Sequence, residues 1–277
     1  RRRHFLPRRG TAVSISETPV YRLRRGTLPL LISIPHLGTT LPAELAARMS
    51  ATAALRQDTD WHLDRLYGFA ASLGASVLTA KLSRYVIDLN RPPDGESLYP
   101  GQTTTGLCPT ETFRGEPLYG DGAGPDAVEQ ARRLALYWRP YHDALAAELA
   151  RLRAGHGAVL LWDAHSIAGV LPRLFEGRLP DLNLGTNSGQ SCAGALIESV
   201  ARVARDSRFS HVVDGRFKGG HITRHYGRPE QNVHAIQLEM RQSLYMDEEP
   251  PFDYLEYRAT TVQPLLQRML LAALQRL

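Results

Sequence analysis

Short apolar runs rich in β-branched residues alternate with longer stretches of helical periodicity along this chain. The apolar runs predict strands over residues 28–34, 75–80, 84–89, 158–162 and 233–240. Apolar positions at helical spacing predict helices over residues 58–73, 126–153, 189–205 and 253–276. Because strands that alternate with helices form sheets covered on both faces, we expect an α/β fold with a mostly parallel sheet.

Capping residues and prolines set the expected helix boundaries. Asp58 or Thr59 can cap the first helix, and Gly74 ends it. We expect Pro140 to bend the second helix and Pro264 to interrupt the last one, because proline removes a backbone donor and its ring crowds the preceding turn.

Two stretches break the alternation of strands and helices. Residues 91–124 hold five prolines and seven glycines, and residues 168–188 have a similar character. A long irregular stretch inside a compact domain is more often a functional loop than a linker. Since no interior stretch has the composition of a domain boundary, we expect a single catalytic domain over residues 21–277.

The composition is that of an ordinary globular protein, with 43% apolar and 22% charged residues. No run approaches the roughly 18 to 20 apolar residues of a membrane span. The net charge is +5, but five arginines lie within the first nine residues, and the remainder is close to neutral. We therefore expect no nucleic-acid partner and no membrane partner. Residues 1–20 lack the apolar core of a secretory signal and an initiator Met, so we expect a disordered or artificially added tail.

The two cysteines, Cys108 and Cys192, are far apart and have no metal-ligand spacing. Two thiols in a chain of this size favour a reducing compartment over a disulfide framework. The sequence therefore predicts a cytoplasmic protein.

Two of the predicted strands deliver a histidine at their carboxyl end. The run Leu-Ile-Ser-Ile-Pro ends on His36, and Val-Leu-Leu-Trp-Asp-Ala leads to His165. Ligands of open α/β sheets gather outside the carboxyl ends of the strands, and histidine is the commonest metal ligand. One such histidine is more often structural, but two at equivalent strand ends favour a shared metal ion. The pattern predicts a metallohydrolase.

A catalytic zinc ion normally takes a third protein ligand and leaves one position for water. The segment Asp58-Thr59-Asp60-Trp61-His62 offers Asp60, with Asp58 and His62 as alternatives. On a helical wheel Asp60 and His62 lie on opposite edges of the apolar stripe, so the spacing does not choose between them. Helix capping is a strong alternative explanation for Asp58 and a weaker one for Asp60.

Arginines accompany these candidate ligands. Arg84, Asn90 and Arg91 flank or end one predicted strand, and arginine binds carboxylates through two parallel hydrogen bonds. This arrangement suggests an anionic substrate or a polarised carbonyl, although pairing with Asp88 would also explain it. The glycine-rich segment 217–227 adds Arg224 and His225 as candidate substrate ligands, and a solvated basic loop is the alternative.

Glu239 lies between Leu238 and Met240 in the last predicted strand, where burial is expected. A buried carboxyl group is costly unless it is paired or functional. Desolvation would raise its pKa toward a value useful for a general base. A structural ion pair with Arg224 or Arg241 is the competing explanation. The chain has neither a glycine fingerprint for nucleotides nor a Gly-x-Ser-x-Gly elbow, so a serine mechanism is not expected.

Several long polar blocks resemble those of the N-formylglutamate deformylase family. They include Ser-Ile-Pro-His-x-Gly (33–38), Asp-Thr-Asp-Trp-His (58–62), Ser-Arg-Tyr-Val-Ile-Asp-Leu-Asn-Arg-Pro-Pro (83–93), Asp-Ala-His-Ser-Ile (163–167) and Gly-Arg-Phe-Lys-Gly-Gly-x-Ile-Thr-Arg-His-Tyr-Gly (215–227). The resemblance spans residues 28–270, with one departure at Leu37, where the family usually has Ser.

The resemblance implies hydrolysis of N-formyl-L-glutamate to formate and L-glutamate in histidine degradation, with Zn²⁺ or another divalent metal. It also implies a three-layer α/β/α sandwich with a mostly parallel mixed sheet, related to zinc carboxypeptidases and aspartoacylase. The roles that it implies are metal ligation by His36, Asp60 and His165, carboxylate binding by Asn90 and Arg91 with Arg224 and His225 as further candidates, carbonyl polarisation by Arg84 and proton transfer by Glu239.

Two other functions remain open from the sequence. The same site could act on another N-acyl amino acid or on a peptide with an acidic C-terminus. A metal-dependent binding protein without turnover is the non-enzymatic alternative. The partner that we expect is a small anionic N-acyl amino acid, bound as the substrate.

Overall fold

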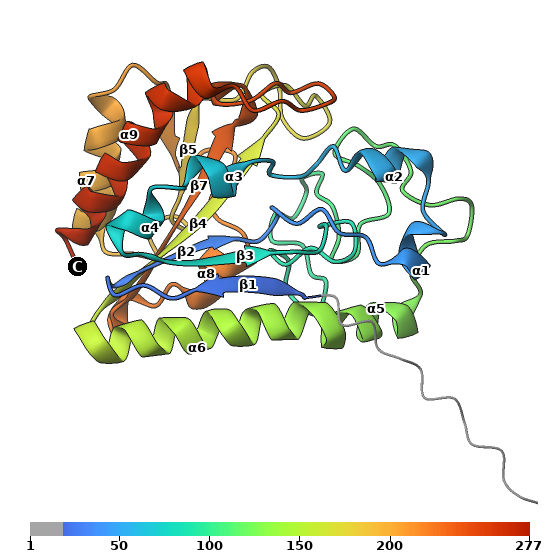
Figure 1. Ribbon diagram of the computed structural model, residues 1–277, viewed down its shortest axis with the longest axis horizontal. Coiled ribbons are helices and arrows are strands. Elements are labelled where there is room, and N and C mark those ends of the chain that lie inside the picture. The colour runs from blue at the N-terminus through green and yellow to red at the C-terminus, as the bar shows by residue number, and fades with distance from the viewer. Residues whose placement is uncertain (1–18) are drawn as a thin grey trace, which may run out of the picture.

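The computed structural model of this chain describes residues 19–277, so most of the predicted tail at 1–20 lies outside the described residues. A seven-stranded sheet runs through the molecule in the order β1-β3-β2-β4-β7-β5-β6 (Figure 1). Its strands are β1 (Tyr21–Arg24), β2 (Leu30–Ile34), β3 (Ser76–Ala80), β4 (Val159–Ile167), β5 (Leu182–Gly185), β6 (His211–Val213) and β7 (Val233–Arg241). β1 is antiparallel to β3 and β5 to β7, and the other neighbours are parallel.

Helices cover both faces of the sheet. α6 lies against one face, and α3, α4, α7 and α9 lie on the other (Figure 1). The α-helices are α1 (Ala43–Ala46), α2 (Ala51–Leu55), α3 (Leu63–Leu66), α4 (Ala70–Leu73), α5 (Ala127–Arg133), α6 (Arg139–His156), α7 (Gly194–Arg205), α8 (His221–Tyr226) and α9 (Glu256–Leu274). A π-helical turn η1 (Leu134–Trp138) and the 3₁₀ turns η2 (Pro229–Gln231) and η3 (Gln242–Leu244) complete the set. The three layers and the mixed, mostly parallel sheet confirm the predicted fold class.

The central strands are apolar on both faces, as expected for strands buried between two helical layers. In β4, Leu160 and Trp162 pack into the core beneath α7 and α9, whereas Val159 and Leu161 pack into the core beneath α6. Side chains alternate along a strand, so Asp163 and His165 continue the face of Leu161. At its carboxyl end, this face of β4 therefore changes from apolar to polar.

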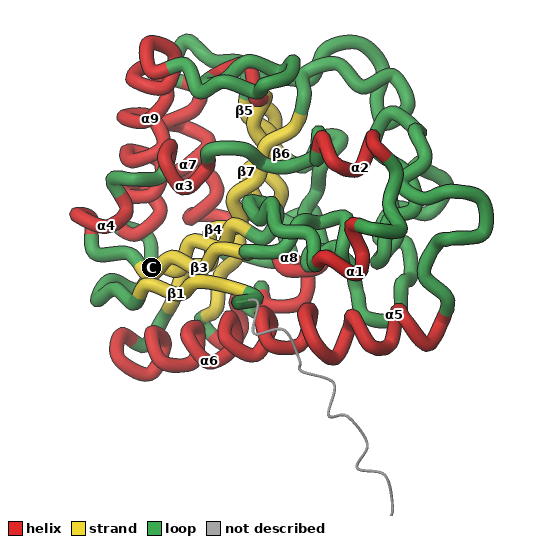
Figure 2. The backbone as a smooth tube through the Cα atoms, turned by 45° about the vertical axis from the view of Figure 1, so that its right-hand side comes forward, coloured by secondary structure: helices red, strands yellow, loops and turns green. Residues whose placement is uncertain are grey.

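Loops gather at one end of the sheet, beside α1 and α2 (Figure 2). They include the stretches that follow β2 and β3. Residues 81–126 contain no helix or strand, in agreement with the long irregular segment expected at 91–124. None of the helices within residues 19–277 is long and apolar enough to cross a membrane.

The predicted strand at 84–89 is wrong. Residues 84–86 form a turn, and the backbone N–H of Asp88 donates to the carbonyl of Leu107 (2.7 Å) instead of to a neighbouring strand. The segment is buried all the same, with Val86 and Ile87 at most 2% exposed. A buried loop and a buried strand have the same apolar composition, so the pattern could not distinguish them.

The predicted helices are confirmed with different boundaries and interruptions. The stretch 58–73 forms two short helices, α3 and α4, and residues 58–62 precede them as a turn. A π-helical turn precedes Pro140, which has no N–H to offer to the previous turn. α9 continues through Pro264, contrary to the predicted interruption, because it packs tightly on α7 with a face of buried apolar residues.

Three short strands and three short helices, α1, α2 and α8, were not predicted. β1, β5 and β6 have only three or four residues each, too few for a periodic signal. β5 arises within the proline- and glycine-rich stretch 168–188, and α8 within the segment 217–227 that resembled a loop. Both depend on neighbours that are distant in sequence.

Candidate active site

His36, just after β2, and His165, among the last residues of β4, meet at the carboxyl ends of the two strands, as their positions predicted. Their ring centroids are 4.9 Å apart. The turn before α3 brings Asp60 to them, because its backbone N–H donates to the carbonyl of His36 (3.0 Å). Asp60 Oδ2 lies 3.1 Å from His165 Nδ1 and 3.7 Å from His36 Nδ1. The three side chains are buried, and one potential ligand atom of each lies within 4.8 Å of the others.

Two further carboxylates orient the imidazoles. Asp88 Oδ1 lies 2.7 Å from His36 Nε2, and Asp163 Oδ2 lies 3.1 Å from His165 Nε2. Metal-binding histidines usually donate their second ring nitrogen to such a carboxylate, which fixes the tautomer. Here the arrangement leaves both Nδ1 atoms directed at Asp60. The donor set of two imidazoles and one carboxylate matches a catalytic zinc site.

The electrostatics of this cluster depend on its mutual hydrogen bonds. Burial by itself would raise the pKa of Asp60, but hydrogen bonds with His165 and His36 hold that pKa well below its usual range. Burial would lower the pKa of His165, and the charge and hydrogen bond of Asp163, together with Asp60, raise it instead. The lowered pKa keeps Asp60 ionised at neutral pH, as a carboxylate that binds a metal ion must be.

The two alternative third ligands point elsewhere. Asp58 Oδ2 accepts a hydrogen bond from the backbone N–H of Phe113 (2.9 Å), and burial raises its pKa to about 6. His62 Nε2 lies 2.7 Å from the carbonyl oxygen of Phe252. Of the three candidates, only Asp60 faces both histidines.

Glu239 lies beside His165 in the register of the parallel pair β4–β7. It is 8% exposed, and desolvation raises its pKa to about 8. Within residues 19–277 its carboxyl group has no ion-pair partner. Arg241 pairs with Asp181 instead, and Arg224 donates to the carbonyl of Gly219 (2.8 Å). Neither structural ion pair considered for Glu239 is therefore formed, and the carboxyl group is available to exchange a proton.

Arg84 and Arg91 line the same pocket as the histidines. Arg84 Nη2 donates to Asp88 Oδ2 (2.6 Å), and its Nη1 lies 3.2 Å from His36 Nδ1. Arg91 Nη1 lies 3.7 Å from the same Asp88 Oδ2, and its Nε donates to the carbonyl of Thr105 (2.8 Å). Two guanidinium groups thus face the pocket, one of them beside the histidine cluster.

Asn90 connects this wall to α8. Its Oδ1 accepts from the backbone N–H of Ile222 (2.8 Å), and its Nδ2 lies 3.0 Å from His165 Nε2. Gly220 packs directly on the amide, since a Cβ at this position would lie 2.3 Å from Asn90 Nδ2. The side chain predicted to contact substrate therefore also supports the orientation of His165.

With this geometry established, comparison with known proteins identifies the family. A family model for N-formylglutamate amidohydrolase matches residues 28–246. The chain belongs to the N-formylglutamate amidohydrolase family. It is 54% identical over 254 residues to N-formylglutamate deformylase of Pseudomonas aeruginosa, covering 91% of this chain and 94% of that protein. The corresponding protein of Pseudomonas putida is 51% identical over 256 residues, covering 92% and 96%.

A solved structure agrees with this assignment. The crystal structure of N-formylglutamate amidohydrolase from Ralstonia eutropha JMP134 matches with a TM-score of 0.77 and 27% identity, covering 92% of this chain and 96% of that one. The match supports the zinc carboxypeptidase-like fold that the sequence resemblance implied. The resemblance to an amidohydrolase family is confirmed.

Two of the candidate substrate ligands lie outside the pocket. Arg224 and His225 belong to α8 and do not line the cavity around the histidines. Arg224 covers the ring of Tyr99 at 4.9 Å, and His225 is exposed and stacks on His221.

Several other residues that line the pocket were not predicted from the sequence. They are Tyr99, Thr103, Thr104, Thr105, Phe113, Arg216, Phe217 and Gln237. Most come from irregular segments, whose side chains no periodicity can orient. The orienting Asp163 could have been found, because it precedes His165 by two residues on a strand and so shares its face.

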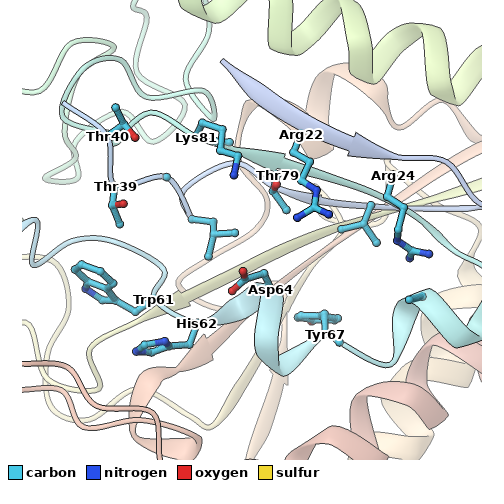
Figure 3. Close-up of a pocket in the computed structure, with 16 residues that line it drawn as sticks. Arg22, Arg24, Thr39, Thr40, Trp61, His62, Asp64, Tyr67, Thr79 and Lys81 are labelled. Carbon is cyan, nitrogen blue, oxygen red and sulfur yellow. The ribbon is translucent and has the colours of Figure 1, made fainter. Parts of the chain in front are cut away.

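A larger cavity of about 610 Å³ is lined in part by Leu37 and Trp61, the residues that follow His36 and Asp60 in the chain (Figure 3). Arg22, Arg24 and Lys81 lie along one side of it, with Asp64 and Tyr67 opposite. Of the site residues considered from the sequence, only His62, an alternative third ligand, lines this cavity. The smaller pocket holds the three candidate metal ligands together with Arg84, Arg91 and Glu239, and it is the active-site candidate in spite of its size.

Proposed function

We propose that this chain hydrolyses N-formyl-L-glutamate to formate and L-glutamate, with a divalent cation, most suitably zinc, held by His36, Asp60 and His165. The observation that carries the proposal is the convergence of three buried ligand side chains next to Glu239, a buried carboxyl group that has no ion-pair partner among residues 19–277. Membership in the N-formylglutamate amidohydrolase family supports the substrate.

In the proposed reaction, the oxygen of a water molecule bonds to the formyl carbon and the carbon–nitrogen bond breaks. Glu239 accepts a proton from the attacking water and donates it to the departing amine nitrogen. Arg84 donates hydrogen bonds to the carbonyl oxygen as negative charge develops there. A zinc ion bound at the cluster would supply Lewis acidity and favour ionisation of water near neutral pH.

The remaining groups orient and bind the substrate. Arg91 is a fixed cation for a substrate carboxylate, held by Thr105 and only loosely paired with Asp88. Asp88 and Asp163 hold the two imidazoles in their ligand orientation. We place the reaction in the cytoplasm, as a step of histidine degradation; the two buried free thiols, Cys108 and Cys192, fit a reducing compartment.

Formate release, measured beside metal content, tests the proposal. We expect formate from N-formyl-L-glutamate, loss of activity on treatment with a chelator and recovery when zinc is added back. N-acetyl-L-glutamate and a peptide ending in glutamate should be poor substrates. Full turnover by metal-stripped protein would contradict the metal site, and comparable turnover of the acetyl or peptidyl compound would favour the broader hydrolase.

Two substitutions separate proton transfer from binding. Glu239→Gln keeps the shape of the side chain but cannot carry a proton, so kcat should fall by about 10²- to 10⁴-fold while the bound metal remains. Arg91→Ala should mainly raise KM, because it removes a contact present in both the ground state and the transition state. Steady-state kinetics with metal analysis provides both measurements, and a Glu239→Gln enzyme with normal kcat would eliminate Glu239 as the base.

A further inference from the structure

Three arginines line the active-site pocket, and they differ in how their charge is compensated. Arg84 and Arg91 share the carboxylate of Asp88, at 2.6 Å and 3.7 Å. Arg216 has no carboxylate within ion-pair distance among residues 19–277. It is therefore the pocket arginine whose charge the described protein leaves uncompensated.

Neutral groups hold Arg216 in place. Its Nε donates to the carbonyl of Leu174 (2.9 Å) and its Nη2 to the carbonyl of Thr103 (3.4 Å). The guanidinium carbon lies 5.1 Å from the ring centroid of Phe217 and 5.5 Å from that of Tyr99. Half-burial lowers the pKa of Arg216, and the positive charge of Arg91 lowers it further against opposing effects of Tyr99 and Glu239. A cation fixed in this way is prepared for an anion that the protein itself does not provide.

The two pocket cations Arg91 and Arg216 are held by the same short segment. Arg91 donates to the carbonyl and the hydroxyl oxygen of Thr105, and Arg216 donates to the carbonyl of Thr103. The segment 103–105 therefore fixes one guanidinium relative to the other. Two cations at a fixed separation suit a ligand with two carboxylates.

The two positions are not equivalent relative to the histidine cluster. Arg91 follows Asn90, which contacts His165, and it pairs with Asp88, which contacts His36. In the described part of the chain, Arg216 has no contact of this kind and lies among Leu174, Phe217 and Tyr99. In an N-formyl dicarboxylic amino acid the α-carboxylate is one carbon from the amide nitrogen, and the side-chain carboxylate is farther away.

We propose that Arg216 binds the side-chain carboxylate of the substrate while Arg91 binds its α-carboxylate, so that Arg216 selects acidic N-formyl amino acids over neutral ones. This inference rests on the proposed deformylase function and adds a specificity residue to it. Arg224, the second cation suggested by the sequence, takes no part in this selection.

The test compares two substrates of nearly the same shape, N-formyl-L-glutamate and N-formyl-L-glutamine, in the metal-loaded enzyme. The wild type should prefer the glutamate compound. Arg216→Gln should lower kcat/KM for this compound by about 10- to 100-fold and leave that for the glutamine compound within a few fold. A residue with a merely structural role would lower both values together.

Two further variants keep the result interpretable. Arg216→Lys retains a charge without the planar fork, so selectivity should persist with a raised KM; this variant also serves if Arg216→Gln fails to fold. Arg178→Gln removes an exposed arginine from the neighbouring segment 168–188 and should behave as wild type.

The outcomes distinguish the two proposals. No formate from N-formyl-L-glutamate with wild-type, metal-loaded enzyme would contradict the proposed function itself. An active, selective wild type whose preference survives in Arg216→Gln would overturn only the role of Arg216. Loss of the preference in Arg224→Gln instead would return the role to the cation suggested by the sequence.

Discussion

At the scale of single residues, the site depends on carboxylates that make several contacts at once. Asp88 receives hydrogen bonds from Arg84 and from the backbone N–H of Asn90, pairs more distantly with Arg91, and holds the Nε2 side of His36. These cations outweigh the effect of burial and keep the pKa of Asp88 well below its usual range. One buried charge therefore fixes both a candidate metal ligand and the cations beside it.

The close packing of Gly220 on Asn90 gives a prediction at this scale. Gly220→Ala would place a Cβ 2.3 Å from the Asn90 amide, which is short, buried and unable to move aside. Because the amide contacts His165, we expect kcat/KM for N-formyl-L-glutamate to fall by about tenfold or more.

The matched control for Gly220→Ala is Gly194→Ala. Gly194 opens α7 and has open space around it, so alanine should leave activity unchanged and increase the free energy of unfolding by about 0.5–1 kcal/mol. Wild-type kinetics in Gly220→Ala would show that the contact does not constrain the site.

At the scale of elements, the helix α5, which lies outside the pocket, anchors the loop that carries Arg84 and Arg91. Arg133 at the end of α5 is fully buried and donates to the carbonyl of Val86 and to the hydroxyl of Tyr119, each at 3.0 Å. Its Nε pairs with Glu129 one turn earlier (2.9 Å). Arg133 thus satisfies the carbonyl of Val86, which no neighbouring strand of residues 19–277 reaches, while Leu107 accepts from the N–H of Asp88.

Removing this anchor should destabilise the fold. Arg133→Ala leaves a buried carbonyl and a buried hydroxyl without their donor, and we expect the free energy of unfolding to fall by about 2–4 kcal/mol. The neighbouring Arg132→Ala removes an exposed pair with Glu44 and a longer one with Glu129 (3.8 Å), which together should cost about 1 kcal/mol or less. Urea denaturation of both variants measures the two free energies of unfolding. If both fall by the same amount, Arg133 does not anchor the loop.

At the scale of the whole molecule, burial between α6 and the rest of the fold keeps one histidine, His142, neutral. His142 on α6 is 4% exposed; its Nε2 lies 2.8 Å from the carbonyl oxygen of Leu89, and its Nδ1 lies 2.9 Å from the Tyr226 hydroxyl. Burial lowers the pKa of His142 from 6.5 to about 3, with the neighbouring His221 and His225 acting in the same direction. The folded state therefore resists a proton that the unfolded chain accepts.

This difference predicts the pH dependence of stability. Below pH 6.5 the unfolded state binds a proton at His142 and the folded state does not, so the free energy of unfolding falls as the pH decreases toward about 3. Between pH 7.5 and 5.5 this single group should contribute a loss of about 1 kcal/mol. Urea titrations at both pH values should show that the free energy of unfolding falls less in His142→Asn than in wild type. An identical fall would exclude His142 as a source of the pH dependence.

The sequence by itself determined the class of fold and the identity of most of the chemistry. The sequence located the four central strands β2, β3, β4 and β7 correctly. These strands are buried between two helical layers, and such burial requires a continuous run of apolar residues. The histidines at the ends of β2 and β4 could be paired in advance, since the carboxyl ends of parallel strands meet at one edge.

Only the tertiary structure decided which polar side chains face one another. Asp60 and Asp88, together with Arg216, lie in turns and loops, where no periodicity fixes the direction of a side chain. Their orientations come from backbone hydrogen bonds to distant segments, such as those from Asp60 to His36 and from Asp88 to Leu107. Local sequence specifies strands through burial, whereas a site assembled from loops is specified by contacts that exist only once the sheet has formed.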